Sequence, residues 1–105
     1  MISEKDLKEI ESLDLEKKLS RVEKMLENKA EPRAIELGLC LALRMALEIR
    51  NGEPLGSSSG KVVAGWMKKY PAELVERSIP LAKQFFTDPK KIADRIREGL
   101  LNENA

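Results

Sequence analysis

The chain has 105 residues, of which 42% are hydrophobic and 35% charged, with 19 Lys and Arg against 18 Asp and Glu. This length predicts one domain with one hydrophobic core, and the composition excludes a disordered tail, a collagen-like chain and a membrane span. The 15 leucines favour helix, whereas only four valines and one threonine argue against a large sheet, so we expect an all-α fold.

Helix signals begin close to the N-terminus. Ser3 followed by Asp6 is typical of a helix start. The helical phase then slips in front of Leu15, so either one helix bends near residues 12–14 or a short helix ends there and Asp14 caps a second. We favour the second interpretation. The second helix has apolar residues at spacings of four, three and four: Leu15, Leu19, Val22 and Leu26.

A central buried helix is predicted for residues 34–50. Pro32 suits the first position of a helix, where its missing N–H costs no hydrogen bond. The residues that follow are apolar on most helical faces, which is typical of a helix surrounded by others. The pair Asn51–Gly52 then provides a left-handed stop. Small residues that let a neighbouring helix come close recur every four positions: Gly38, Ala42 and Ala46.

Residues 51–60 have the composition of a flexible Gly/Ser linker. The apolar pattern continues on both sides, so we place this loop inside a single helical domain that spans residues 1–105. Gly-Ser tracts are also common in engineered joints, and the sequence leaves open whether this loop is native.

The second half of the chain is divided by prolines. Ser59 is placed to cap a helix that begins at residue 60 or 61 and ends before Pro71. Another helix follows, in which Pro80 predicts a break or a kink. The sequence around Pro89 predicts a last helix that runs to about Leu101. We therefore expect a compact, irregular or orthogonal bundle of five to six helices, in which the short helices cross residues 34–50 at steep angles.

The chain contains no histidine, and Cys40 is its single cysteine. Without histidine, Ser-His-Asp triads, Cys-His nucleophiles and histidine-bearing zinc sites are excluded. A lone cysteine cannot form an intramolecular disulfide or a cysteine-rich metal site. Cys40 lies in the most apolar stretch of the chain, so we expect it to be a small buried hydrophobic side chain. We therefore expect neither an enzyme nor a metal or cofactor site.

The loop from Gly56 to Lys61 has some features of a phosphate-binding loop. Only three residues separate its glycines, and Val62 stands where a nucleotide-binding loop needs Ser or Thr, so the spacing argues against nucleotide binding. The N-terminus of the following helix is a weaker candidate for binding an anion, and the alternative is a loop with a serine cap. This candidate anion site consists of Ser58, Ser59, Gly60 and Lys61.

Basic and aromatic residues are combined between Trp66 and Tyr70. Lysines neutralise phosphates and aromatic rings stack on bases, so this pattern favours single-stranded nucleic acid, although both rings also suit the core. Residues 61–105 carry 9 basic and 6 acidic side chains, a net charge of +3. The nucleic-acid alternative uses basic residues of this half: Lys61, Lys68, Lys69, Lys90, Lys91, Arg95 and Arg97.

The leading functional prediction comes from the apolar surplus of residues 35–49. Flanking helices either bury all of it or leave a patch that binds a protein partner or a second copy. We expect a non-enzymatic helical interaction module, a small subunit or adaptor, with a nucleic-acid-binding accessory protein as the alternative. Residues 1–13 lack the long apolar stretch of a secretory signal, so we expect a cytoplasmic protein. The scarcity of His, Gln and Thr fits a thermophilic source.

Overall fold

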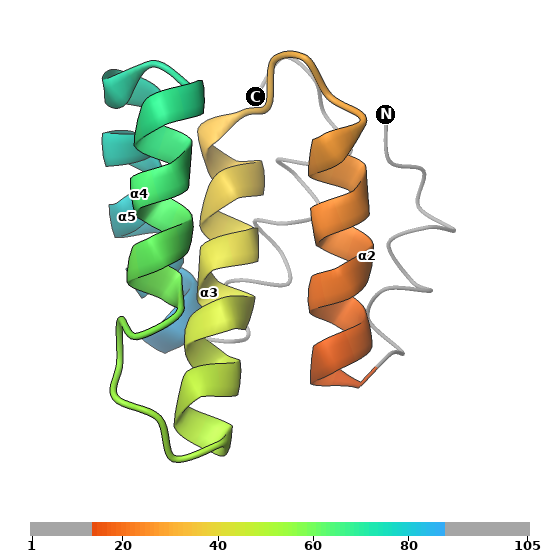
Figure 1. Ribbon diagram of the computed structural model, residues 1–105, viewed down its shortest axis with the longest axis vertical. Coiled ribbons are helices and arrows are strands. Elements are labelled where there is room, and N and C mark those ends of the chain that lie inside the picture. The colour runs from red at the N-terminus through yellow and green to blue at the C-terminus, as the bar shows by residue number, and fades with distance from the viewer. Residues whose placement is uncertain (1–13, 88–105) are drawn as a thin grey trace.

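The computed structural model describes residues 14–87 of the chain. Within these residues it contains four helices and no strand: α2 (Leu15–Glu27), α3 (Ala34–Arg50), α4 (Ser59–Lys69) and α5 (Ala72–Thr87). Figure 1 shows α3 in the middle, with α2 on one side and α4 and α5 on the other. The prediction of a compact all-α fold is confirmed. None of the helices described is long and apolar enough to cross a bilayer.

The central helix α3 has the predicted bounds and packs against each of the other three described helices. Its N-terminus is closed by Glu36, whose carboxylate accepts a hydrogen bond from the backbone N–H of Arg33 at 2.8 Å. Pro32 therefore precedes the capping residue and does not occupy the first helical position. At the other end Gly52 has φ +71°, which confirms the left-handed stop.

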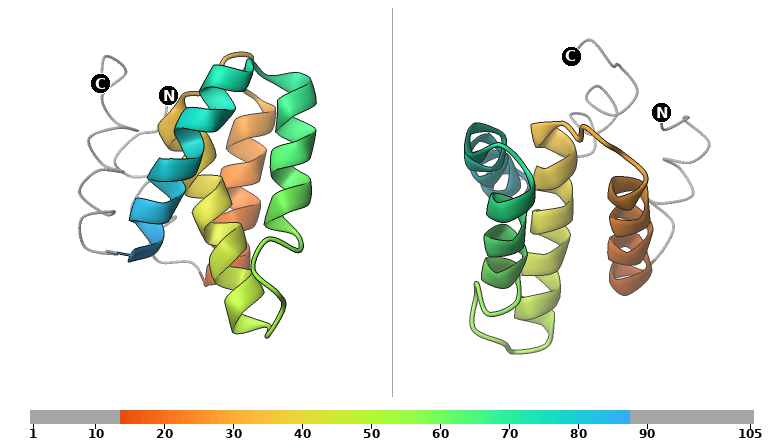
Figure 2. Two further views of the ribbon diagram at one scale, coloured as in Figure 1. Left: turned by 90° about the vertical axis from the view of Figure 1, so that its left-hand side faces the viewer. Right: turned by 45° about the horizontal axis from the view of Figure 1, so that its top comes forward.

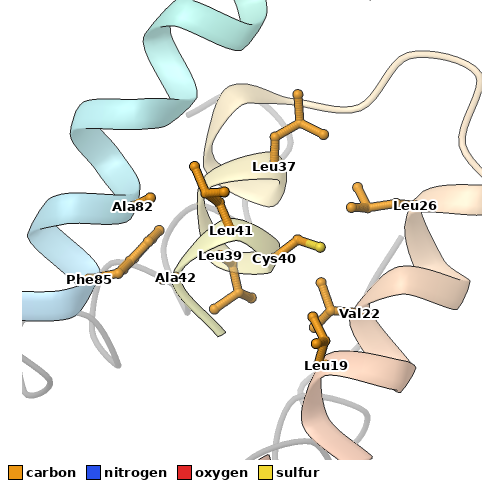
Figure 3. Packing of buried hydrophobic residues seen from close by; sticks show 10 residues of the cluster. All are labelled: Leu19, Val22, Leu26, Leu37, Leu39, Cys40, Leu41, Ala42, Ala82 and Phe85. Carbon is orange, nitrogen blue, oxygen red and sulfur yellow. The ribbon is translucent and has the colours of Figure 1, made fainter. Parts of the chain in front are cut away.

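Helix α2 begins where the sequence predicts. The carboxylate of Asp14 accepts a hydrogen bond from the backbone N–H of Lys17 at 3.0 Å and so caps the helix. The buried side chains of α2 then face α3, as Figure 3 shows. The interpretation that Asp14 starts a helix of its own is confirmed, and the segment before it lies outside the described residues.

The core is centred on the first half of α3, between α2 and α5 (Figure 3). Leu37 is completely buried, and α5 comes close to α3 beside it, at Gly38. A Cβ atom on Gly38 would lie 3.0 Å from the Cβ of Leu81 and 3.1 Å from the carbonyl oxygen of Ser78. Figure 2 shows α5 crossing α3 obliquely. The predicted close approach at this glycine is therefore confirmed.

Helix α5 runs through Pro80 without interruption. Pro80 lies on the exposed side, while Val75, Ser78 and Ala82 are buried on the other side. This apolar burial outweighs the hydrogen bond that proline removes. Of the predicted break or kink at Pro80, the break is therefore wrong, and the described part holds four helices where the sequence predicted five to six. The predicted helices near Ser3 and after Pro89 lie outside the described residues.

Candidate interaction surface around helix α4

Helix α4 has fewer buried side chains than the other described helices, and Ser59 is the one residue of α4 that is buried. Val62, Val63 and Trp66 are half-buried, and Met67 is 45% exposed. The helix packs on α3 and α5, but its backbone does not come close to α2. Much of the apolar face of α4 is therefore left uncovered by the described part of the chain.

A groove of about 170 Å³ lies between α4 and α2, and we call it the aromatic groove. Trp66 of α4 and Tyr70, the residue that follows α4, line it, and Cys40 of α3 and Leu26 of α2 also line it. Figure 3 shows the thiol of Cys40 pointing toward α2. Charged residues also line this groove: Glu23, Glu27 and Lys69. The aromatic groove thus combines apolar walls with charges of both signs.

A second groove, of about 190 Å³, lies between α3, α4 and α5, and we call it the apolar groove. It is lined by Leu41 and Met45 of α3, Val63 of α4 and Ile79 of α5. Leu55 of the loop before α4 also lines it and is 58% exposed. Because a cavity of roughly 150 Å³ holds a benzene molecule, this groove has room for one aliphatic side chain.

A buried carboxylate holds the N-terminus of α4. Glu48 of α3 is completely buried, and its oxygens accept hydrogen bonds from the hydroxyl of Ser59 at 2.7 Å and of Ser57 at 3.1 Å. They also accept bonds from the backbone N–H groups of Ser58 at 2.8 Å and Ser59 at 3.2 Å. We call Glu48 and these three serines the Glu48 clasp. It ties α4 to the last turn of α3.

The clasp keeps Glu48 ionised. Burial by itself raises the pKa of a carboxyl group, but the hydrogen bonds from Ser59 and from the backbones of Ser58 and Gly56 outweigh it. The result is a pKa lowered from 4.5 to about 2. The positive end of the α4 dipole favours the same negative charge. The N-terminus of α4 is thus an anion site that the chain fills with its own side chain.

The predicted anion site is placed around this carboxylate. Ser58 and Ser59 already donate to Glu48, whereas Gly60 and Lys61 are exposed. An external anion would therefore compete with Glu48 for the same N–H groups, and binding of such an anion stays a prediction. Sequence reasoning missed Glu48 itself. The feature that could have indicated the role of Glu48 is its position, as an acidic residue in a mostly apolar helix shortly before a serine-rich loop.

Three of the seven basic residues in the nucleic-acid prediction lie on α4: Lys61, Lys68 and Lys69. All three are exposed, and α4 contains no acidic residue. The ammonium of Lys69 lies 5.3 Å from the centre of the Tyr70 ring, in a cation–π contact. The remaining four lie outside the described residues: Lys90, Lys91, Arg95 and Arg97.

Cys40 is buried as predicted, with 2% of its surface exposed. Burial raises the pKa of its thiol to about 12, and the nearby carboxylate of Glu23 adds to this effect while Arg44 opposes it. Burial and a raised pKa both disfavour the thiolate form of Cys40. Among residues 14–87, no three Cys, Asp or Glu side chains are grouped to hold a metal ion. No family model, curated protein or solved structure matches this chain.

Proposed function

We propose that this protein is a non-enzymatic helical interaction module, a small subunit or adaptor, whose contact surface is the face around α4. The observation that carries the proposal is the exposed Leu55 at the edge of the apolar groove. An apolar side chain beside an unfilled apolar groove leaves both in water, and association removes both from it.

A second copy of the chain is the partner that this arrangement favours. In a two-fold symmetric dimer the same patch of each copy meets the other, so a protruding group and the hollow that receives it must lie on the same face of the chain. Leu55 and the apolar groove satisfy this condition. In this proposal each copy inserts its Leu55 into the groove of the other, so one dimer contains the contact twice.

Sedimentation velocity from micromolar to near-millimolar concentration tests the proposal. We expect a monomer–dimer equilibrium that Leu55→Asp weakens by at least tenfold, because the dimer loses two apolar contacts and gains two charges. Ile49→Asp is the matched control, since Ile49 is 53% exposed but does not line the groove. A strict monomer over the whole range, or equal weakening by both variants, would contradict self-association through Leu55.

One observation supports the nucleic-acid alternative, namely the three exposed lysines of α4 with no acidic residue among them. Against it, Glu23 and Glu27 line the aromatic groove and repel phosphates, and Lys69 covers a face of the Tyr70 ring. Titration with a single-stranded oligonucleotide, followed by Trp66 fluorescence, tests it. If this function is correct, the affinity for the oligonucleotide weakens steeply as the salt concentration rises. Fluorescence of Trp66 that does not change on addition of oligonucleotide at low salt excludes this function.

A further inference from the structure

Helix α4 is attached to the described core chiefly at its two ends. At its N-terminus the Glu48 clasp supplies four hydrogen bonds. At its C-terminus Tyr70 has an extended backbone, with φ −116° and ψ 160°, and connects through Pro71 to α5. These two connections fix where α4 begins and where it ends.

Between its ends α4 has little to hold it. No residue from 60 to 69 is buried, and the aromatic groove and the apolar groove lie on either side of the helix. Only half-buried side chains link this stretch to α3 and α5. The apolar burial that opposes separation is therefore much smaller for α4 than for α5.

The segment in front of α4 can change its direction. Gly52 and Gly56 have positive φ angles of 71° and 96°, and a Cβ atom on either would meet nothing within 4 Å. Residues 51–57 are all exposed. No side chain therefore packs over these two glycines, and the segment is held by a few backbone hydrogen bonds, such as those from the N–H of Glu53 to the carbonyl oxygen of Glu48 at 2.8 Å and from the N–H of Gly60 to that of Gly56 at 2.9 Å.

The clasp suits a reversible contact. The hydrogen-bond donors to Glu48 are all neutral, and no ion pair to it is found among the described residues. When α4 moves away, the carboxylate gains water in exchange for these bonds. The free-energy difference between the bonded and hydrated states is much smaller than the strength of the bonds themselves.

We propose that α4 opens and closes as a unit on the α2–α3–α5 core, and that the Glu48 clasp holds it closed. Opening removes one wall from each groove and uncovers the side of α3 that carries Cys40 and Leu41. If the proposed self-association is correct, this movement also controls it, because α4 and its loop carry part of the contact surface. The opening itself does not depend on that function.

Native-state hydrogen exchange of the wild-type chain, at increasing urea and below the concentration of self-association, tests the opening directly. We expect the amides of residues 62–69 to exchange at least tenfold faster than those of residues 37–42 in the absence of urea. Their exchange should also depend less on urea, because opening α4 exposes less surface than unfolding. Equal rates and a single urea dependence for both groups would overturn the proposal.

Two variants then identify what holds α4. Glu48→Gln should speed exchange in α4 about tenfold or more, because it weakens hydrogen bonds that are present in the closed state and absent from the open state. Exchange in α3 should rise by the same factor, since unfolding also breaks the clasp. Val22→Ala should speed exchange in α3 but not in α4, because Val22 does not line the aromatic groove and the backbones of α2 and α4 do not come close to each other.

Glu53→Gln is the control for the loss of charge, since Glu53 is an exposed glutamate of the same loop. It should leave exchange in both helices unchanged. Unchanged exchange of α4 in Glu48→Gln would show that the clasp does not hold the helix and would overturn that part of the proposal. These measurements use the monomer, so failure to dimerise has no effect on their outcome.

Discussion

Helix α3 contacts α5 and α4 in two different ways. Toward α5 it presents Gly38, so the backbones meet, and Val75 and Ala82 are completely buried there. The contact between α3 and α4 is different, because the buried residue of α4 is the polar Ser59, which donates a hydrogen bond to Glu48 of α3. Continuous apolar burial makes the first interface part of the core. The second depends on a few hydrogen bonds at one end, so it can be broken without unfolding the rest.

The two buried glutamates of α3 illustrate the same contrast. Glu36 lies near the N-terminus of α3 and forms ion pairs with Lys29 and Arg33. These interactions overcome the effect of burial and lower the pKa of Glu36. Glu48 lies near the C-terminus of α3, where the helix dipole disfavours a negative charge. The charge of Glu36 is thus stabilised mainly by its own helix and the segment before it, whereas the buried charge of Glu48 is stabilised by hydrogen bonds from the N-terminus of α4 and the loop before it.

The largest expected effect is the loss of a completely buried core side chain of α3. Leu37→Ala removes a completely buried leucine and should lower the free energy of unfolding by about 2–5 kcal/mol. Met67→Ala on α4 removes a side chain of similar size that is 45% exposed, and should change stability by less than about 0.5 kcal/mol. Urea denaturation followed by circular dichroism measures both values, and similar losses would contradict the view that α4 contributes less buried apolar surface than the core.

The next effect is the pH dependence that Glu48 contributes. The pKa of Glu48 in the folded chain, about 2, is below its ordinary value of 4.5. Its ionised form therefore stabilises the fold above pH 4.5, and this stabilisation is lost as the pH falls toward 2. Replacing Glu48 by Gln should lower the unfolding free energy by about 1.5–3 kcal/mol at pH 7.

The difference in unfolding free energy between wild type and Glu48→Gln should shrink as the pH falls through this range. The wild-type chain and the variant both retain Glu36, whose own titration therefore cancels in the comparison. Urea titrations of the two proteins at several pH values measure the difference. A constant gap down to pH 2 would show that the charge of Glu48 contributes nothing and that shape alone explains the effect of the substitution.

Gly38→Ala tests the close approach of α3 and α5. The added methyl group would lie 3.0 Å from the Cβ of Leu81 and 3.1 Å from a backbone oxygen, so α5 has to shift outward. We expect a loss of about 1–3 kcal/mol in the free energy of unfolding, in spite of the better helix propensity of alanine. An unchanged urea midpoint would mean that α5 adjusts freely and that the interface is less rigid than its burial suggests.

The sequence predicted α3 and its surroundings well because the signals there are local and redundant. A nearly continuous apolar stretch, small residues spaced by four and Asn51–Gly52 all indicate the same buried helix. Asp14 likewise caps α2 through a bond to a residue only three positions away. Helix caps and apolar spacing of this kind involve residues that are close in sequence, so they can be recognised without knowledge of the tertiary structure.

The remaining features depend on contacts between distant segments. Pro80 has a local effect that favours a break, but burial of Val75 and Ala82 on α3 overrides it. The role of Glu48 depends on serines ten and eleven residues later, which the loop brings back to the end of α3. A pattern of residue types does not show that the loop folds back onto α3. The contact between Glu48 and these serines could therefore not be predicted from the sequence.

The smallest predicted effect has the opposite sign and concerns Gly65 in the middle of α4. A Cβ atom there would meet nothing within 4 Å, in contrast to Gly38. Alanine should therefore stabilise the helix by about 0.5–1 kcal/mol through its better propensity alone. The urea midpoint of Gly65→Ala should rise slightly. A loss of stability would mean that a neighbour lies close to this face of α4, and the picture of α4 as a thinly covered helix would be wrong.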